Sequence, residues 1–192
     1  MSAPVKKPRV VSLGTPRFVG DDYLARFAEE FNYSVLEASD RKSTQEQLPL
    51  EIQKNGPIDA FIIRMGTTPY EPFDEGLLSA LVPGCRIIVS ASAGYNEFDV
   101  EWMARHKMWF CNTVDAVAEA TADMAIFLIL AALRNTSNAE KSARSGTWRS
   151  AAALVPGRDP SGLTLGIVGL GAIGKVGRAS FSITHPVHCL SS

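Results

Sequence analysis

Short hydrophobic runs and helical patterns alternate along the first 112 residues. The runs are almost continuously apolar, as strands buried on both faces of a parallel sheet must be. Five such runs alternating with helices predict a doubly wound α/β domain. We expect strands at 9–13, 33–37, 60–63, 86–90 and 108–111, and helical segments at 21–30, 44–55, 73–81 and 100–106.

A long apolar helix is predicted after the fifth strand. In "DAVAEATADMAIFLILAALRN", Asp115 is the expected N-cap and Arg134 lies at the negative end of the helix dipole. The run from Ala125 to Leu133 is less than half of the roughly 20 residues that span a bilayer, so we expect a helix buried between two layers. A polar stretch with proline and glycine then predicts a domain boundary before a new strand, "LTLGIVGL".

The last residues differ in composition from those before them. Acidic residues stop at Asp159, and residues 161–192 contain neither Asp nor Glu. Helical or strand periodicity is lost from Val176 onward, because Gly177, Pro186 and β-branched residues make a poor helix and an interrupted strand. We therefore expect this tail to be foreign to the preceding chain and unable to complete a second domain.

Composition and charge restrict the partners. The 192 residues carry 19 Lys and Arg against 20 Asp and Glu, a net charge of −1, so no global field attracts nucleic acid or an anionic membrane. Residues 1–9 lack the apolar stretch and cleavage site of a signal peptide. The three cysteines form no CxxC pair, which favours a reducing compartment. We expect a cytosolic protein with small-molecule or protein partners, and Cys85 and Cys111 as buried core residues.

A glycine motif follows the predicted strand in the last part of the chain. Gly169, Gly171 and Gly174 form G-x-G-x-x-G between an apolar strand and a potential helix, the context of a dinucleotide-binding turn. Gly169 would allow the tight turn, Gly171 the close approach of a pyrophosphate, and Gly174 the packing of helix on strand. The backbone N–H groups near Ala172 and Ile173 would face the phosphates. The alternative is a glycine-rich strand-to-helix turn without a ligand.

Four segments in order resemble a known family. No Tyr-x-x-x-Lys occurs, which excludes the short-chain dehydrogenase mechanism. The segments "SASAGYNEFD", "NTVDAVAEATADMAIFLILAALRN", "SGTW" and "GLTLGIVGLGAIGK", after a flavodoxin-like domain, are similar to the D-isomer-specific 2-hydroxyacid dehydrogenases, in particular the glyoxylate and hydroxypyruvate reductase branch. The resemblance covers residues 9–175. It implies a flavodoxin-like doubly wound parallel sheet followed by the first strand and turn of a truncated Rossmann domain.

The resemblance also implies a set of binding residues. In the family, the loop matching Ala93 and Gly94 supplies backbone N–H groups to the substrate carboxylate, although the loop alone would read as an ordinary turn. Thr121 falls where the family has a threonine near the nicotinamide, and its alternative is a core helical residue that bonds back to its own helix. Arg64, at the end of the third strand, could attract an anionic substrate or simply be an exposed strand-end arginine.

The residues that carry out the chemistry in the family have no match here. Hydride transfer from a 2-hydroxy acid needs a base and a cation near the carbonyl. The family supplies them as a histidine, its acidic partner and an arginine, all far beyond the glycine motif. His185 and His188 lie too close to that motif, and with Cys189 they lack a fourth metal ligand, so we assign no catalytic residue and no metal site. The acidic residue about 20 positions past the motif, which holds the ribose, is also absent, so the cofactor is NAD or NADP.

These observations lead to one expectation and two alternatives. We expect residues 1–135 to form the substrate domain with its interdomain helix, 136–160 a linker, and 161–192 a truncated start of the NAD(P)-binding domain with an aberrant tail. Such a chain, the product of a retained intron, a frameshift or a gene-model error, would be an inactive piece of an NAD(P)-dependent oxidoreductase acting on small 2-hydroxy acids and 2-oxo acids. One alternative is a non-catalytic fragment that pairs with the full-length enzyme or with itself, since the family helix matching 117–134 takes part in subunit pairing. The other is a weak anion-binding domain.

Overall fold

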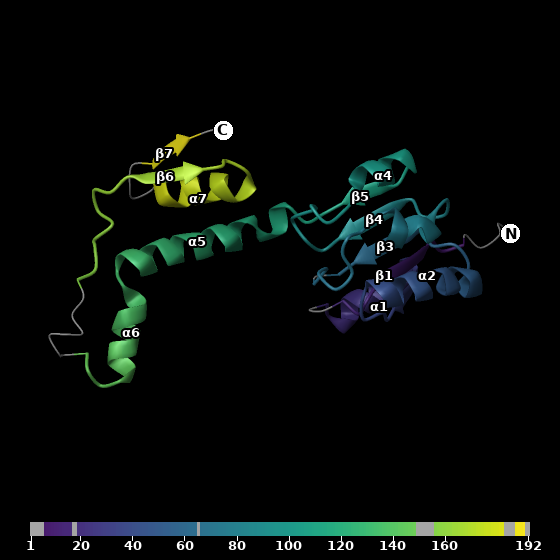
Figure 1. Cartoon of the computed structure of the whole chain (residues 1–192), viewed down its shortest axis with the longest axis horizontal. Helices are drawn as coiled ribbons and strands as arrows, with labels where there is room; N and C mark the ends of the chain where they lie inside the picture. Colours follow the sequence, from purple (N-terminus) through teal and green to yellow (C-terminus); the bar gives the residue numbers. More distant parts are fainter. Residues whose placement is uncertain (1–5, 17–18, 65, 149–155, 183–186, 191–192) are drawn as a thin grey trace. The chain divides into compact units, whose positions relative to one another are not determined.

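The chain divides into two compact units, Met1–Thr113 and Val114–Ser192. The computed structural model describes residues 6–16, 19–64, 66–148, 156–182 and 187–190. Figure 1 shows its elements in sequence colours.

The first unit is built on a parallel sheet of five strands in the order β2-β1-β3-β4-β5. The strand at the sheet centre, β3, pairs on one side with β1 and on the other with β4, so that Ile63 lies beside both Leu13 and Ser90. This arrangement confirms the predicted parallel α/β domain. The strands are β1 (Arg9–Leu13), β2 (Asn32–Leu36), β3 (Ala60–Ile63), β4 (Ile87–Ser90) and β5 (Trp109–Cys111).

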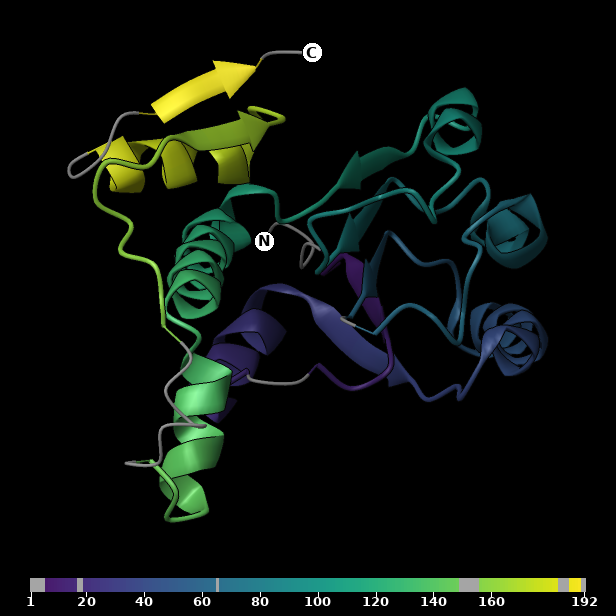
Figure 2. The same ribbon diagram turned by 60° about the vertical axis from the view of Figure 1, so that its left-hand side comes forward.

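Helices cover the two faces of this sheet unequally. Figure 2 shows α1 on one side of the sheet and α2, α3 and α4 on the other. Aspartate side chains accept from backbone N–H groups at the start of three of these helices: Asp40 before α2, Asp74 before α3 and Asp99 before α4. The helical segments are α1 (Asp21–Glu30), α2 (Arg41–Asn55), α3 (Glu75–Leu78), the 3-10 turn η1 (Ser79–Leu81) and α4 (Val100–Arg105).

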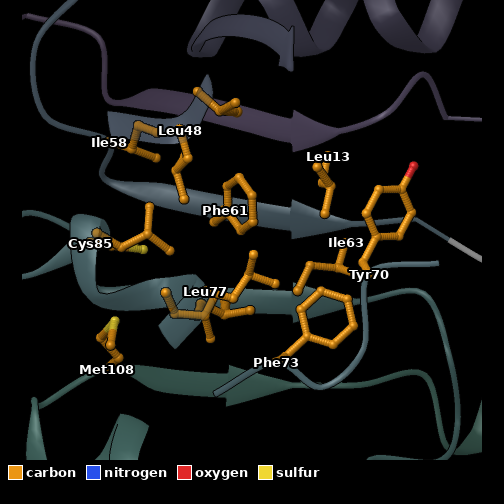
Figure 3. Close-up of a cluster of buried hydrophobic side chains, with 14 of the residues drawn as sticks. Leu13, Leu48, Ile58, Phe61, Ile63, Tyr70, Phe73, Leu77, Cys85 and Met108 are labelled. Atoms are coloured by element: carbon orange, nitrogen blue, oxygen red, sulfur yellow. The ribbon is translucent and has the colours of Figure 1, made fainter. Parts of the chain in front are cut away.

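The hydrophobic core lies between the sheet and the α2 side. Alternate strand residues point into it, and side chains from α2 and α3 meet them there (Figure 3). Each fully buried aliphatic or aromatic side chain of this kind contributes about 1.5–3 kcal/mol. The central members are Leu13, Leu48, Phe61, Ile63, Leu77 and Ile88. This core fixes the position of the strand ends, and therefore of the loops that follow them.

The second unit joins two successive helices to a small βαβ element. After the 3-10 turn η2 (Asp115–Val117), α5 (Ala118–Leu133) leads into α6 (Thr136–Arg144). The strands β6 (Leu165–Val168) and β7 (Val187–Leu190) pair in parallel, with Leu165 beside Val187. The helix α7 (Ala172–Ser182) connects these strands and packs along α5.

The long apolar helix differs from the prediction in two respects. Asp115 is not its N-cap: it begins η2, and α5 starts after Val117 without a side-chain cap. The helix is also not buried, since only Ala118 and Ala122 are, because its unit supplies few elements to pack around it. Residues 115–133 are long and apolar enough to cross a membrane by length and composition, a test that core helices of globular proteins also pass. Four of its larger side chains are exposed: Met124, Phe127, Leu128 and Leu130.

The expectation that the tail lacks regular structure is wrong over much of its length. The helix α7 continues through Val176 and Gly177 to Ser182, and residues 187–190 form β7. Pairing with β6 and packing against α5 outweigh the low propensity of this segment, as tertiary contacts commonly do.

Three further features differ from what the sequence predicted. The segment predicted as a linker contains α6, and α5 belongs with the second unit, which begins at Val114. Cys85 is buried as expected, but Cys111 is exposed on β5, the last strand in the order of the described five-stranded sheet.

Candidate functional site

The first part of the candidate site lies at the carboxyl edge of the five-stranded sheet. Loops that follow parallel strands meet at this edge, where α/β proteins bind their ligands. Gly14 follows β1, Arg64 follows β3, and the loop Ala91–Asn96 follows β4. The residues predicted to bind substrate, Arg64, Ala93 and Gly94, therefore all lie at one edge of the first unit.

The loop after β4 is held by bonds to three successive carbonyl groups. The backbone N–H of Thr113 donates to Ser92 O at 3.1 Å, and Asn112 Nδ2 donates to Ala93 O at 2.8 Å. Ser92 Oγ donates to Gly94 O at 2.9 Å and lies 2.7 Å from Ser90 Oγ. Residues from β4, from the loop itself and from the segment after β5 thus fix the loop together.

These bonds leave the amides of the loop pointing away from the protein's own acceptors. In a planar trans peptide, the carbonyl of one residue and the N–H of the next point in opposite directions. Fixing the carbonyls of Ser92 and Ala93 therefore aims the N–H groups of Ala93 and Gly94 outward. Neither N–H donates to an acceptor among the described residues. Two adjacent N–H groups without an acceptor among the described residues are available to hydrogen-bond an anion such as a carboxylate.

Arg64 occupies the neighbouring position on the edge. Its guanidinium extends across Gly14 at the end of β1, where any side chain would collide with it. Arg64 Nη2 lies 3.4 Å from Tyr70 Oη, and that hydroxyl donates to Ala38 O at 2.8 Å. Arg64 is half-buried and held by this contact. It is therefore not the freely exposed strand-end arginine that was the alternative to an anion-binding role.

The second part of the candidate site is the glycine turn of the second unit. Gly169 directly follows β6 and has φ +90, a conformation that favours glycine. A Cβ at Gly174 would lie well inside 3.0 Å of Gly169 O, whereas one at Gly171 would meet nothing within 4 Å. Both observations agree with the predicted division of roles, in which Gly174 permits close packing and Gly171 leaves an open approach.

The start of α7 supplies the donors for this turn. The N–H of Lys175 donates to Gly171 O at 3.0 Å, so Gly171 precedes the first helical residue. The N–H groups of Ala172, Ile173 and Gly174 are then the ones without an intrahelical acceptor, as at every helix start. A helix start with open space over Gly171 fits the pyrophosphate of a dinucleotide.

Thr121 lies on α5 in the second unit. Its side chain is exposed, and its hydroxyl donates to Val117 O at 2.7 Å. The back-bonding expected of a helical threonine is present, but the residue is not in a core. A role near the nicotinamide stays a prediction for Thr121.

Other chemistry-bearing residues do not gather into a site. Burial raises the pKa of the Cys85 thiol to about 11, so it stays protonated and unreactive at neutral pH. The described residues contain no group of three or more His, Cys, Asp or Glu that could hold a metal ion. His185 lies outside the described residues, and His188 and Cys189 belong to β7.

Sequence reasoning missed the residues that hold the substrate loop and Arg64 in place. Asn112 and Ser92 donate to carbonyls of the loop, and the Tyr70 hydroxyl accepts from Arg64 and donates to Ala38 O. Their only signal in the sequence is a polar residue directly after, or within a few positions of, a strand end. Such residues are too common in loops to be distinguished without coordinates.

Comparisons with known proteins agree on one group of enzymes. The family model described as D-isomer specific 2-hydroxyacid dehydrogenase, catalytic domain, matches residues 18–182. The chain is 56% identical over 177 residues to the dehydrogenase efuE of Hormonema carpetanum, covering 91% of this chain and 44% of that protein. It is 32% identical over 174 residues to a glyoxylate reductase of Pyrococcus furiosus, covering 88% of this chain and 48% of that protein.

A solved structure extends the similarity over nearly the whole chain. The apo form of D-mandelate dehydrogenase from Rhodotorula graminis superposes with a TM-score of 0.83 at 26% identity, covering 97% of this chain and 56% of that one. The chain therefore spans about half the length of the relatives it matches. The sequence relationship continues beyond Lys175, where it was expected to stop, because the matched region reaches residue 182.

Proposed function

Because the chain belongs to the D-isomer-specific 2-hydroxyacid dehydrogenase family, we propose that it forms the substrate-binding part and the start of the cofactor-binding part of an oxidoreductase. The proposed reaction interconverts small 2-hydroxy acids and 2-oxo acids of the glyoxylate or hydroxypyruvate type with NAD or NADP. The observation that supports it most directly is the pair of outward-facing N–H groups at Ala93 and Gly94. Their peptide planes are fixed because the carbonyls of Ser92 and Ala93 accept hydrogen bonds. The proposed location of the protein is the cytosol.

The residues of this chain would bind and orient the reactants. Two amides hold a carboxylate through charge-assisted hydrogen bonds, which are about twice as strong as neutral ones. Arg64 adds a positive charge at the same edge and raises the local concentration of anionic substrate. Gly169, Gly171, Ala172, Ile173 and Gly174 would hold the cofactor, which as NAD(P)H would donate a hydride to the 2-oxo acid and as NAD(P)⁺ would accept one from the 2-hydroxy acid. Without a matching base and cation, residues 1–192 assayed alone bind these ligands without turnover.

The test separates binding from turnover. We expect glyoxylate to raise the melting temperature of the purified chain, while absorbance at 340 nm with NADH and glyoxylate stays at the background rate. Gly94→Pro removes the donor N–H, and Gly94→Ala keeps it with a Cβ that meets nothing within 4 Å. Only the proline variant should lose the glyoxylate effect. Turnover that increases with protein concentration, or equal responses of both variants, would contradict the proposal.

A second candidate rests on the exposed apolar side chains of α5. Met124, Phe127 and Leu128 are 56%, 60% and 57% exposed. Large apolar side chains that are exposed together often mark a surface that binds a partner. In this alternative the chain pairs through α5 with a full-length family enzyme, or with a second copy of itself. Mixing the chain with the Hormonema carpetanum dehydrogenase and separating by size should give a joint peak that Leu128→Glu abolishes and Glu119→Gln, on the same helix, retains. Separate elution at micromolar concentrations would remove this candidate.

A further inference from the structure

Asn112 stands directly after β5, beside the loop that follows β4. The two strands are neighbours in the sheet, with Val89 paired to Cys111, so the residues after them are brought side by side. Asn112 Nδ2 reaches Ala93 O at 2.8 Å, across 19 positions in sequence, and the next residue, Thr113, donates its N–H to Ser92 O at 3.1 Å.

Each of these bonds fixes one peptide plane of the loop. The carbonyl of Ala93 and the N–H of Gly94 belong to the same planar unit, so holding the oxygen sets the direction of the N–H. The carbonyl of Ser92 and the N–H of Ala93 are related in the same way. Two consecutive residues after β5 thus fix the two planes whose N–H groups face outward.

We infer that Asn112 is a positioning residue that presents the Gly94 amide to the substrate carboxylate. The inference rests on the proposed function, in which that amide is one of the two carboxylate donors. Asn112 touches neither substrate nor cofactor in this role and acts only through the Ala93–Gly94 peptide. A donor side chain of this length is required, because Ala93 O can only accept.

The identity of residue 112 makes the role testable through pH. In Asn112→Asp, an ionised carboxylate would face Ala93 O without a proton to share, and the peptide plane would turn away. When that carboxyl is protonated it can donate to Ala93 O and restore the arrangement. Since hydrogen bonding to the neutral acid and loss of solvent both favour the protonated form, its pKa in the folded protein is raised, and the donor returns as the pH falls.

Two measurements on the full chain carry the test. The first is glyoxylate affinity, followed as ligand-induced stabilisation between pH 5 and pH 7.5. Asn112→Asp should bind about tenfold more weakly than the natural chain at pH 7.5, about the effect of one hydrogen bond, and recover most of its affinity at pH 5. Asn112→Ala should bind weakly at both values. Asn96→Asp is the control, because it adds the same charge to the same loop at an exposed residue.

The second measurement needs no ligand. The Ala91 N–H donates to Ile63 O and the Ser92 N–H to Ser90 Oγ, so these two amides report on the order of the loop. Their hydrogen exchange, read in a peptide that covers residues 91–96 and compared with the natural chain at the same pH, should be faster in Asn112→Asp at pH 7.5 and close to normal at pH 5. Unchanged exchange in that peptide in both Asn112 variants overturns the positioning role, whatever the chain binds. If exchange responds as expected but the natural chain shows no glyoxylate stabilisation, the proposed function fails and Asn112 holds a loop that does not recognise carboxylates, which also overturns the inference. An equal loss of glyoxylate affinity in Asn96→Asp would show that added charge causes the effect, and this would also overturn the inference.

Discussion

The glycine turn of the second unit allows a sharp separation of packing from ligand approach. At Gly174 an added Cβ would lie well inside the 3.0 Å that real Cβ atoms essentially never cross, and its neighbour is the backbone carbonyl of Gly169. A backbone atom in a tight turn cannot swing aside as a side chain can. Overpacking of this kind costs about 1–3 kcal/mol, and we expect Gly174→Ala near the upper value.

Gly171→Ala is the matched control, at a glycine three residues earlier in the same turn. Its added Cβ meets nothing within 4 Å. Since Gly171 only precedes the first helical residue, alanine there should cost less than about 1 kcal/mol. The methyl group would nevertheless stand in the open space that the proposed pyrophosphate would approach. Gly171→Ala should therefore leave the turn intact and weaken NADH binding.

Amide hydrogen exchange read by mass spectrometry distinguishes the two variants. Peptides from β6 and α7 should exchange about 100-fold faster in Gly174→Ala, which is about 3 kcal/mol of local stability, and about fivefold faster or less in Gly171→Ala. Fluorescence titration with NADH then tests the second variant. Exchange within threefold of the natural chain in Gly174→Ala, or equal exchange in the two variants, would refute the steric reasoning.

Three further outcomes follow from the first unit. Loss of solvent alone would raise the pKa of Asp74, but the hydrogen bond from Arg41 and the positive charge of Arg41 outweigh it, so the pKa is lowered. The Asp74 carboxylate therefore adds stability that is present above about pH 4 and lost as the pH falls through the folded pKa. Asp74→Asn should lower the urea midpoint at pH 7 and converge with the natural chain in acid. A thiol reagent at pH 8 should label exposed Cys111 well before buried Cys85, assigned by mass spectrometry. Glu51→Gln should cost about 3 kcal/mol in urea unfolding, because Arg9, which is 6% exposed, loses its ion-pair partner.

The fold of the first unit was predictable because its signals are local. Continuous apolar runs fixed β1 and β3 to the residue, and most other boundaries to within three positions. Burial on both sheet faces dictates such runs, whichever residues fill them. The glycine turn was predictable for the same reason, since only glycine suits Gly169 and Gly174.

The second unit and the support of the site were less predictable because they depend on distant contacts. The helix α7 crosses Gly177, and β7 forms by pairing with β6, neither of which the tail's own propensities indicate. The exposure of α5 depends on what its unit supplies to pack against it, which composition cannot tell. Asn112 and Tyr70 acquire their roles only when the sheet brings separate segments together.

Apart from the Ala91 N–H, which donates to Ile63 O, the hydrogen bonds that shape the loop after β4 join residues between Ser90 and Thr113. The glycine turn, by contrast, is made wholly from residues 169–175. Under the proposed function, the contacts that would recognise the acid and those that would recognise the nucleotide therefore come from separate short segments. A substitution in one segment would then change which acid is accepted while leaving nucleotide binding unchanged, and the reverse.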